Sequence, residues 1–354
     1  MRQTLWIAAL LLVACTAEPA PTPSPPPATP NPAPIPATLP ALDDTGWLSL
    51  ADEGVNVANY DANNLQPLRA LGFGWIQVFN PPEFPVEGFR VLYRVPLHDA
   101  ASGEPTAINR WADQLESLAR ERRGVIHAYA IGNEVNLSRE WGGQQPDPEA
   151  YAKLLAIAYA RIKTADPTAL VISAGIAPTG GNSDGAMDDL SYARTLFELG
   201  AADYMDAYGF HPYGFAYEPE RDPSSPETGG LVFRRAELHR TLMESFGIAD
   251  KLMWATEFGW LVDPAEEGLA CTLPGLDWQR VSRAQQAEYV LRAFRFARQF
   301  WPWMGPMFLW NYDFSRSPLY PDPCEQMKFY SMLDNSGNER PLLAALRRAA
   351  KTSQ

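Results

Sequence analysis

The sequence lacks the residue patterns that mark several common chemistries. Its four histidines, His98, His127, His211 and His239, include no HExxH motif or other close pairing that would ligate a metal. No Gly-x-Ser-x-Gly elbow is present, and no Gly-rich phosphate-binding turn follows an early predicted strand. We therefore expect neither a metal nor a cofactor, and the nucleophile of a serine hydrolase is missing.

Basic residues are also scarce. The chain has 29 Lys and Arg against 42 Asp and Glu, a net charge of -13, so it lacks the positive footprint that a phosphate backbone requires. This charge balance argues against a nucleic-acid partner. An acidic, solvated surface accounts for the negative charge, which by itself does not indicate a substrate. With 354 residues, 46% of them hydrophobic, the chain can build one large core. We expect a monomer.

Cysteine is rare, and the three cysteines have different settings. Residues 1–15 have the basic start, at Arg2, and the short apolar run of a signal peptide. That run ends in Leu-Val-Ala-Cys15, which resembles the bacterial lipobox and implies a lipid anchor at Cys15 on the outer side of the membrane. An ordinary secretory cleavage site is the alternative. Cys271 and Cys324 lie in predicted loops of an exported domain, where a disulfide or two free thiols are possible.

Residues 16–42 are predicted to be a linker. Half of the 22 residues from 19 to 40 are proline, and most of the others are Ala, Thr or Ser. Such a segment cannot bury a core and favours polyproline II conformations. We expect it to tether the remaining residues, 43–354, to the anchor as a single domain.

The chain after the linker alternates predicted strands and helices. Apolar, β-prone runs predict eight strands, at residues 47–51, 73–79, 89–96, 125–132, 170–174, 204–210, 252–256 and 307–310. Helix signals lie between most of them, including an Asp147-Pro148 start and a Ser282/Gln285 capping box. The connection after the second strand is too short for a full helix. This alternation predicts an α/β fold, a (β/α)8 TIM barrel, with an open doubly wound sheet as the alternative.

Two glutamates come at the ends of predicted strands. Glu134 follows the fourth strand in Gly-Asn133-Glu134, and Glu257 ends the seventh in Thr-Glu257-Phe-Gly-Trp260. The C-terminal ends of barrel strands carry functional residues in this fold. A structural ion pair could explain either glutamate singly, but two carboxylates at facing strand ends suggest chemistry on glycosidic bonds.

Both motifs resemble those of the clan A glycoside hydrolases, which include cellulase-like and β-xylosidase-like groups. The resemblance implies a retaining enzyme that acts on β-glycosidic bonds of a carbohydrate, with Glu134 as general acid and base and Glu257 as nucleophile. It further implies that Asn133 binds the 2-hydroxyl of the sugar. Val135 departs from the pattern, because several of these families have proline there.

Six further residues are candidates for substrate binding. By the same resemblance, His211 and Tyr213 after the sixth strand would contact substrate or the acid and hold Glu257 ionised, and Trp310 would stack under a sugar ring. A structural role is the alternative for His211 and for Trp310. The others are Arg94 on the third strand, and Trp141 and Trp260 near the ends of the fourth and seventh. A second hypothesis remains open, a surface lipoprotein that binds glycans without cleaving them.

Overall fold

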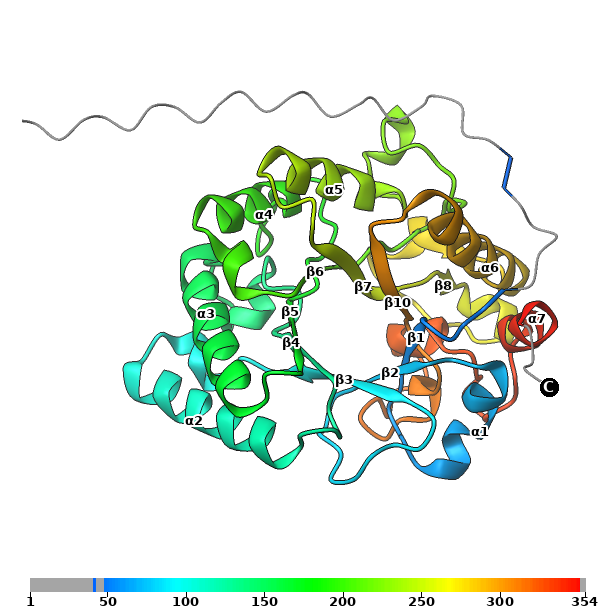
Figure 1. Cartoon of the computed structure of the whole chain (residues 1–354). Coiled ribbons are helices and arrows are strands. Elements are labelled where there is room, and N and C mark those ends of the chain that lie inside the picture. Colours follow the sequence, from blue (N-terminus) through cyan, green and yellow to red (C-terminus); the bar gives the residue numbers. More distant parts are fainter. Residues whose placement is uncertain (1–40, 43–47, 351–354) are drawn as a thin grey trace, which may run out of the picture.

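The computed structural model describes residues 41–42 and 48–350. The predicted signal segment with Cys15 and almost all of the predicted linker lie outside these residues. None of the helices within the described part is both long enough and apolar enough to cross a membrane. The described residues form one barrel with helices around it (Figure 1).

Eight parallel strands close this barrel in the order β1-β10-β7-β6-β5-β4-β3-β2. Their bounds are β1 (Gly54–Asn56), β2 (Trp75–Val78), β3 (Arg90–Val95), β4 (Ala128–Ile131), β5 (Leu170–Ser173), β6 (Ala207–Phe210), β7 (Leu252–Phe258) and β10 (Met304–Leu309). The two-residue strands β8 (Leu261–Val262) and β9 (Arg280–Val281) form a separate pair. The predicted (β/α)8 fold is confirmed.

Seven α-helices in the described part of the chain lie outside the barrel (Figure 1). They are α1 (Ala62–Leu71), α2 (Pro105–Glu121), α3 (Pro148–Ala165), α4 (Asp189–Glu198), α5 (Arg235–Ser245), α6 (Arg283–Phe300) and α7 (Pro341–Ala349). The segment between β2 and β3 contains none, as its length predicts.

The helix signals in the sequence act as expected. The Asp147 side chain accepts a hydrogen bond from the Ala150 amide at the start of α3, which satisfies one of the free N–H groups of the first turn. Ser282 and Gln285 form the reciprocal capping box of α6. Such caps fix where each helix begins, and therefore how long a loop precedes it.

The first strand was expected at residues 47–51, and this prediction is wrong. β1 is the three-residue segment Gly54–Asn56, whereas the Leu48 amide bonds the carbonyl of Ala349 at the end of α7. A Cβ on Gly54 would lie 2.2 Å from the Phe308 ring. The strand therefore begins with glycine because an aromatic ring fills the barrel beside it, and such a segment carries no apolar run for the sequence to display.

The barrel interior changes character along its axis. Its N-terminal half is filled by apolar side chains, with the rings of Trp75, Trp254 and Phe308 in mutual contact. Because alternate residues of a strand face inward, the next inward positions are Gln77 and Thr256, which are buried polar residues. The barrel interior is thus apolar and closed at the N-terminal ends of the strands, and it is polar at their C-terminal ends.

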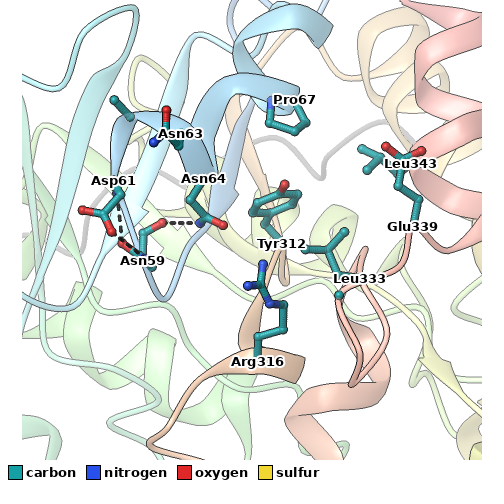
Figure 2. Close-up of a pocket in the computed structure, with 12 residues that line it drawn as sticks. Asn59, Asp61, Asn63, Asn64, Pro67, Tyr312, Arg316, Leu333, Glu339 and Leu343 are labelled. Atoms are coloured by element: carbon teal, nitrogen blue, oxygen red, sulfur yellow. Dashed lines mark hydrogen bonds between the residues drawn. The ribbon is translucent and has the colours of Figure 1, made fainter.

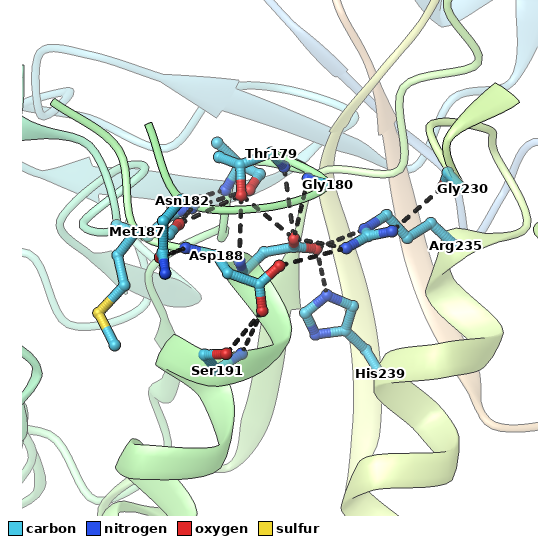
Figure 3. Close-up of polar contacts among 12 residues, drawn as sticks. Thr179, Gly180, Asn182, Met187, Asp188, Ser191, Gly230, Arg235 and His239 are labelled. Atoms are coloured by element: carbon cyan, nitrogen blue, oxygen red, sulfur yellow. Dashed lines mark hydrogen bonds and ion pairs between the residues drawn. The ribbon is translucent and has the colours of Figure 1, made fainter. Parts of the chain in front are cut away.

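A buried polar network joins α4, α5 and the loop after β5 (Figure 3). Asp189 accepts two hydrogen bonds from the Arg235 guanidinium, at 2.6 and 2.7 Å, and lies 2.9 Å from Nε2 of His239. Its Oδ1 also lies 3.4 Å from the amides of Thr179 and Gly180. Burial raises the pKa of Asp189, but the hydrogen bonds from His239 and Arg235 outweigh it and hold that pKa well below its ordinary value.

Candidate active site

A cavity of about 280 Å³ opens at the C-terminal ends of the strands. Its walls come from the ends of β3, β4, β6, β7 and β10 and from the loops that follow β4 and β10. The lining residues are Arg94, Asn133, Glu134, Arg139, Glu140, Tyr213, Glu257, Trp310, Tyr320, Gln326, Met327 and Tyr330. Six of the nine candidate residues therefore share one cavity, and a seventh, His211, lies directly behind it.

Glu134 leaves β4 through a sharp backbone turn. Gly132 has φ +82° and Glu134 itself has φ +42°, in the left-handed region that non-glycine residues seldom adopt. The turn is held by a hydrogen bond from the Glu134 amide to the Gly175 carbonyl, at 2.9 Å. A strained residue at a cavity is more often functional than accidental. The strain here aims the carboxylate of Glu134, which is 7% exposed, into the cavity.

His211 connects Glu134 with the end of β7. Its Nδ1 lies 3.1 Å from Glu134 Oε1, and its Nε2 lies 3.0 Å from the Thr256 hydroxyl. Burial lowers the pKa of His211, so the ring is neutral and only one nitrogen carries a proton. The Thr256 hydroxyl can donate to Nε2, which leaves the Nδ1 proton to be donated to Glu134. A Cβ on Gly175 would lie 2.0 Å from Nε2, so glycine is required there.

Glu257 lies one residue before the end of β7 and is 4% exposed. The Tyr213 hydroxyl donates a hydrogen bond of 2.8 Å to Glu257 Oε2, and His211 Nδ1 is 3.7 Å from the same oxygen. Burial, with the neighbouring Glu257 charge, raises the pKa of Tyr213 well above its ordinary value. Tyr213 therefore remains a hydrogen-bond donor to Glu257 at every physiological pH.

The carboxylates of Glu134 and Glu257 are close together. One oxygen of each, together with a nitrogen of His211, fall within 4.8 Å of one another, the one such group of potential metal ligands within the described residues. However, the Arg139 guanidinium already contacts Glu134 as an ion pair, and a second cation beside it would be repelled. We assign no metal, and interpret the group as two carboxylates that face one small cavity.

Asn133, Trp310 and Arg94 complete the predicted set inside the cavity. The Asn133 amide is 3.4 Å from Glu140 Oε1. Trp310, joined to Asn311 by a cis peptide bond, is 5% exposed and packs edge-on against Phe79 and Phe314. Arg94 lies over the Phe79 ring, 4.4 Å from its centroid, and forms no ion pair with a described carboxylate.

Several lining residues were not predicted. Arg139 pairs with Glu134 although its side chain is 55% exposed, and the only signal for it is its position five residues later in the same loop. Tyr330 lies 5.5 Å, ring to ring, from Tyr213, and burial raises its pKa. Tyr330 belongs to the long segment after β10, which the sequence pattern does not place. Tyr320, Gln326 and Met327 reach the cavity from the same segment.

Trp141 and Trp260 were expected at outlying sugar-binding positions, and neither lines the cavity. Trp141 is 7% exposed and its indole N–H donates to the Val135 carbonyl, at 2.7 Å. Trp260 is fully buried, and its indole donates to the Tyr217 carbonyl, at 2.8 Å. Both expectations are wrong for the same reason: each indole faces the protein and serves as a support for a loop of the catalytic face.

Cys271 and Cys324 form a disulfide, with their Cα atoms 5.3 Å apart. Cys271 belongs to the segment between β8 and β9, and Cys324 to the segment after β10 that carries Tyr320 and Tyr330. The bond thus ties together two loops at the same end of the barrel. The segment after β10 supplies part of the cavity wall.

A second cavity, of about 640 Å³, lies between α1, the segment after β10 and α7 (Figure 2). It is larger, but both of its carboxylates are exposed and already have partners. Asp61 accepts a hydrogen bond from Asn59, at 3.0 Å, and Glu339 pairs with Arg347, at 2.7 Å. It holds no pair of facing buried carboxylates, so we place the candidate active site in the smaller cavity.

Solved structures that resemble this chain include glycoside hydrolases. A family 39 enzyme from Bacteroides cellulosilyticus aligns over 85% of this chain and 64% of its own, with TM-score 0.59 and 17% identity. A family 128 endo-β-1,3-glucanase from Sorangium cellulosum aligns over 85% and 100%, with TM-score 0.54 and 17% identity. A family 39 enzyme from Xanthomonas axonopodis aligns over 88% and 67%, with TM-score 0.57 and 17% identity.

The likeness lies in the fold. No protein-family model matches the chain, and no curated protein sequence matches it. The chain spans less than two thirds of the Bacteroides enzyme that it resembles. The chain shares the barrel fold of these glycoside hydrolases, whereas substrate and residue roles have to be argued from the site itself.

Proposed function

We propose that the protein is a retaining glycoside hydrolase that cleaves β-linked, or equivalent equatorial, bonds of an oligo- or polysaccharide. The observation that carries the proposal is the pair of buried carboxylates, Glu134 and Glu257, with oxygens within 4.8 Å of each other in one cavity. Retaining enzymes hold their two carboxyl groups about 5 to 5.5 Å apart, whereas inverting enzymes need about 6.5 to 9.5 Å to admit a water.

In this mechanism Glu257 is the nucleophile. The Tyr213 hydroxyl donates to its Oε2 and orients the carboxylate, and attack on the anomeric carbon forms a covalent glycosyl-enzyme. Glu134 protonates the departing oxygen and then, as a base, takes a proton from the water that releases the sugar. Asn133 is in reach of the 2-hydroxyl, and Trp310 forms the floor under the ring.

Arg139 sets a condition on this mechanism. A guanidinium on Glu134 favours the carboxylate over the acid, yet the first step needs the acid. Because the Arg139 side chain is 55% exposed, it can withdraw into solvent when a leaving group enters. The contact suits the second step, in which Glu134 acts as a base.

The same contact is the observation that favours the second candidate, a glycan-binding protein that does not hydrolyse. If Arg139 stayed on Glu134 in the complex, no proton donor would face the bond. The cavity would then hold a sugar through Trp310, Asn133 and the carboxylates without cleaving it.

Covalent trapping separates the two candidates. The full chain is incubated with a panel of activated 2-deoxy-2-fluoro glycosides, which form the glycosyl-enzyme quickly and release it slowly, and intact mass is recorded. We expect one added fluorosugar, located on Glu257 by peptide mapping, and none on the Glu257→Gln variant. Absence of any adduct, with no turnover of aryl glycosides or polysaccharides, would overturn the enzyme and leave the binder. β-1,3-Glucans belong in that panel, since endo-β-1,3-glucanases share the fold.

We further propose that the chain is a bacterial lipoprotein, anchored at Cys15 and held outside the cytoplasm by the proline-rich linker. The lipobox-like residues before Cys15 support this. Growth of an expressing bacterium with an alkyne fatty acid should label the wild type and not Cys15→Ser. Equal labelling of both would contradict the anchor and leave the proposed enzymatic function untouched.

A further inference from the structure

An exposed aromatic pair lies beyond the cavity on the same end of the barrel. Phe215, in the loop after β6, and Trp278, in the short 3-10 helix Asp277–Gln279, stack with ring centroids 5.0 Å apart and an interplanar angle of 22°. Trp278 is 48% exposed although Phe215 covers one of its faces. A tryptophan backed by a second ring and open on the rest of its surface is a ready platform for an apolar ligand face.

The backbone is shaped to present Phe215. Its φ is +54°, a conformation that a bulky residue adopts rarely. The preceding Gly214 lies against Trp260, where a Cβ would come within 2.0 Å of the indole. The Tyr217 carbonyl accepts the indole N–H of Trp260, and the Tyr217 amide bonds the Gly214 carbonyl, at 3.1 Å. The buried Trp260 therefore supports this loop, through its packing against Gly214 and its hydrogen bond to the Tyr217 carbonyl.

Trp278 is joined to the cavity through its neighbour. The Tyr330 hydroxyl lies 3.3 Å from Gln279 Oε1, and the Tyr330 ring is 5.5 Å from that of Tyr213, which bonds Glu257. Phe215 follows Tyr213 by two residues. The pair and the cavity wall thus share the loop after β6, and the hydrogen bond between Tyr330 and Gln279 joins the helix of Trp278 to the cavity wall.

The disulfide fixes the platform relative to the cavity. Cys271 lies in the same loop as Trp278, and Cys324 lies in the segment of Tyr330. The loop is also fixed at its end, where Arg280 pairs with Asp277, at 2.5 Å, and with Asp263, at 3.5 Å. A surface that is ordered before binding loses less entropy when the ligand arrives.

We propose that Phe215 and Trp278 form an outer sugar-binding subsite, which stacks a unit of the same glycan whose scissile bond lies between Glu134 and Glu257. The class of ligand follows from the surface: a pyranose ring in an equatorial, β-linked chain presents a flat face of C–H groups to an indole, while its hydroxyls point to water. The substrate is therefore an oligo- or polysaccharide rather than a single glycoside. This inference rests on the proposed function, which identifies the ligand as a glycan.

The test measures binding as a function of chain length. In the Glu257→Gln background, calorimetry is run with laminari-, cello- and xylo-oligosaccharides of two to six units. We expect Trp278→Ala to weaken the binding of the longer members by about 3- to 10-fold, which is the size of one aromatic stacking contact, and to leave that of the disaccharides unchanged. Trp278→Tyr should restore most of the loss. Tyr204→Ala is the matched control: Tyr204 is an exposed aromatic, edge-on to Tyr159, just before the N-terminal end of β6.

The outcomes separate the two proposals. Equal affinities of Trp278→Ala and its parent for every length, or no length-dependent binding at all, would overturn the subsite, even if the wild type hydrolyses glycans. Length-dependent binding that Trp278→Ala weakens, in a wild type that forms no glycosyl-enzyme, would support the subsite and refute the enzyme. A loss of affinity equal for short and long members would show that Trp278→Ala disturbs the cavity itself, and would also overturn the subsite.

Discussion

Two buried clusters in this barrel are built from the same three kinds of side chain. Each contains a carboxylate, a histidine and an arginine: Asp189, His239 and Arg235 in one (Figure 3), and Glu134, His211 and Arg139 in the other. In both, the histidine lies between the carboxylate and a hydroxyl, from Tyr208 or Thr256. In both, burial lowers the histidine pKa. Residue type alone does not distinguish them.

The clusters differ in what the arginine faces. The Arg235 side chain is 5% exposed and donates a hydrogen bond to each oxygen of Asp189. That cluster is therefore closed to any ligand. The Arg139 side chain is 55% exposed and meets Glu134 at the edge of a cavity that also holds Glu257. A buried charged network whose hydrogen bonds are all made to protein groups stabilises the fold. A network that is partly exposed to solvent can replace one of its interactions with a contact to substrate. The predictions below test this distinction.

The largest effect is expected at Glu257. Replacing the nucleophile with its amide in Glu257→Gln should lower kcat by at least about 10³-fold, because no glycosyl-enzyme can form. The fold should persist, since Gln keeps the volume and can still bond Tyr213. The control is Glu339→Gln, a carboxylate in the larger cavity of Figure 2, which should keep full activity. Steady-state rates and circular dichroism check both, and an active Glu257→Gln would refute the assignment.

Glu257 and Glu134 could be predicted as site residues from the sequence because both follow apolar runs, and an apolar run is the sequence pattern of a buried strand. The sequence could not supply β1, whose Gly54 is dictated by the Phe308 ring from the far end of the chain. It also could not tell that Trp260 faces inward, because the side of a strand end depends on local backbone geometry. Arg139 and Tyr330 were missed because loop conformation brings them to the cavity, and no periodicity records that.

The closed cluster should matter for stability. Asp189→Asn leaves the buried Arg235 guanidinium with only the more distant Asp188 carboxylate, at 3.8 Å, and breaking a buried pair costs about 3–5 kcal/mol. Urea unfolding followed by circular dichroism measures the loss. Asp203→Asn, at an exposed aspartate, should change the free energy of unfolding by less than about 0.5 kcal/mol. If the two variants were equally stable, the closed cluster would have no structural role.

Glu134→Ala should depend on the leaving group. Without a proton donor, hydrolysis of glycosides with poor leaving groups should fall by about 10²- to 10⁴-fold, whereas activated aryl glycosides need little protonation and should form the glycosyl-enzyme at nearly the normal rate. Added azide should then restore turnover by attacking that intermediate, because it needs no general base. A variant with full activity on poor leaving groups would remove Glu134 from the mechanism.

Arginine replacements compare the two clusters directly. Arg235→Gln should destabilise the fold, as Asp189→Asn does, whereas Arg139→Gln should change stability by less than about 1 kcal/mol because its ion pair is exposed at one side. Arg139→Gln should instead extend the activity to higher pH, since loss of the guanidinium favours the protonated form of Glu134. The alkaline limb of the pH–kcat/KM profile measures this. An unshifted limb would mean that Arg139 does not influence the protonation of Glu134 in the free enzyme.

The smallest expected effect is a pH dependence that the two clusters share. His211 and His239 both have pKa values lowered from 6.5, chiefly by burial, so the unfolded chain binds more protons than the native one when the pH is below 6.5. Their contribution to stability is therefore complete above pH 6.5 and is lost as the pH falls toward the folded pKa values, at no more than about 1.4 kcal/mol per pH unit for each histidine. Urea midpoints should be lower at pH 5.5 than at pH 7.5, and His239→Gln should reduce the difference between them. If His239→Gln left this difference unchanged, the pKa of His239 would not be lowered by folding. His239 would then be protonated in the folded protein at pH 5.5, and Asp189 would form ion pairs with both His239 and Arg235.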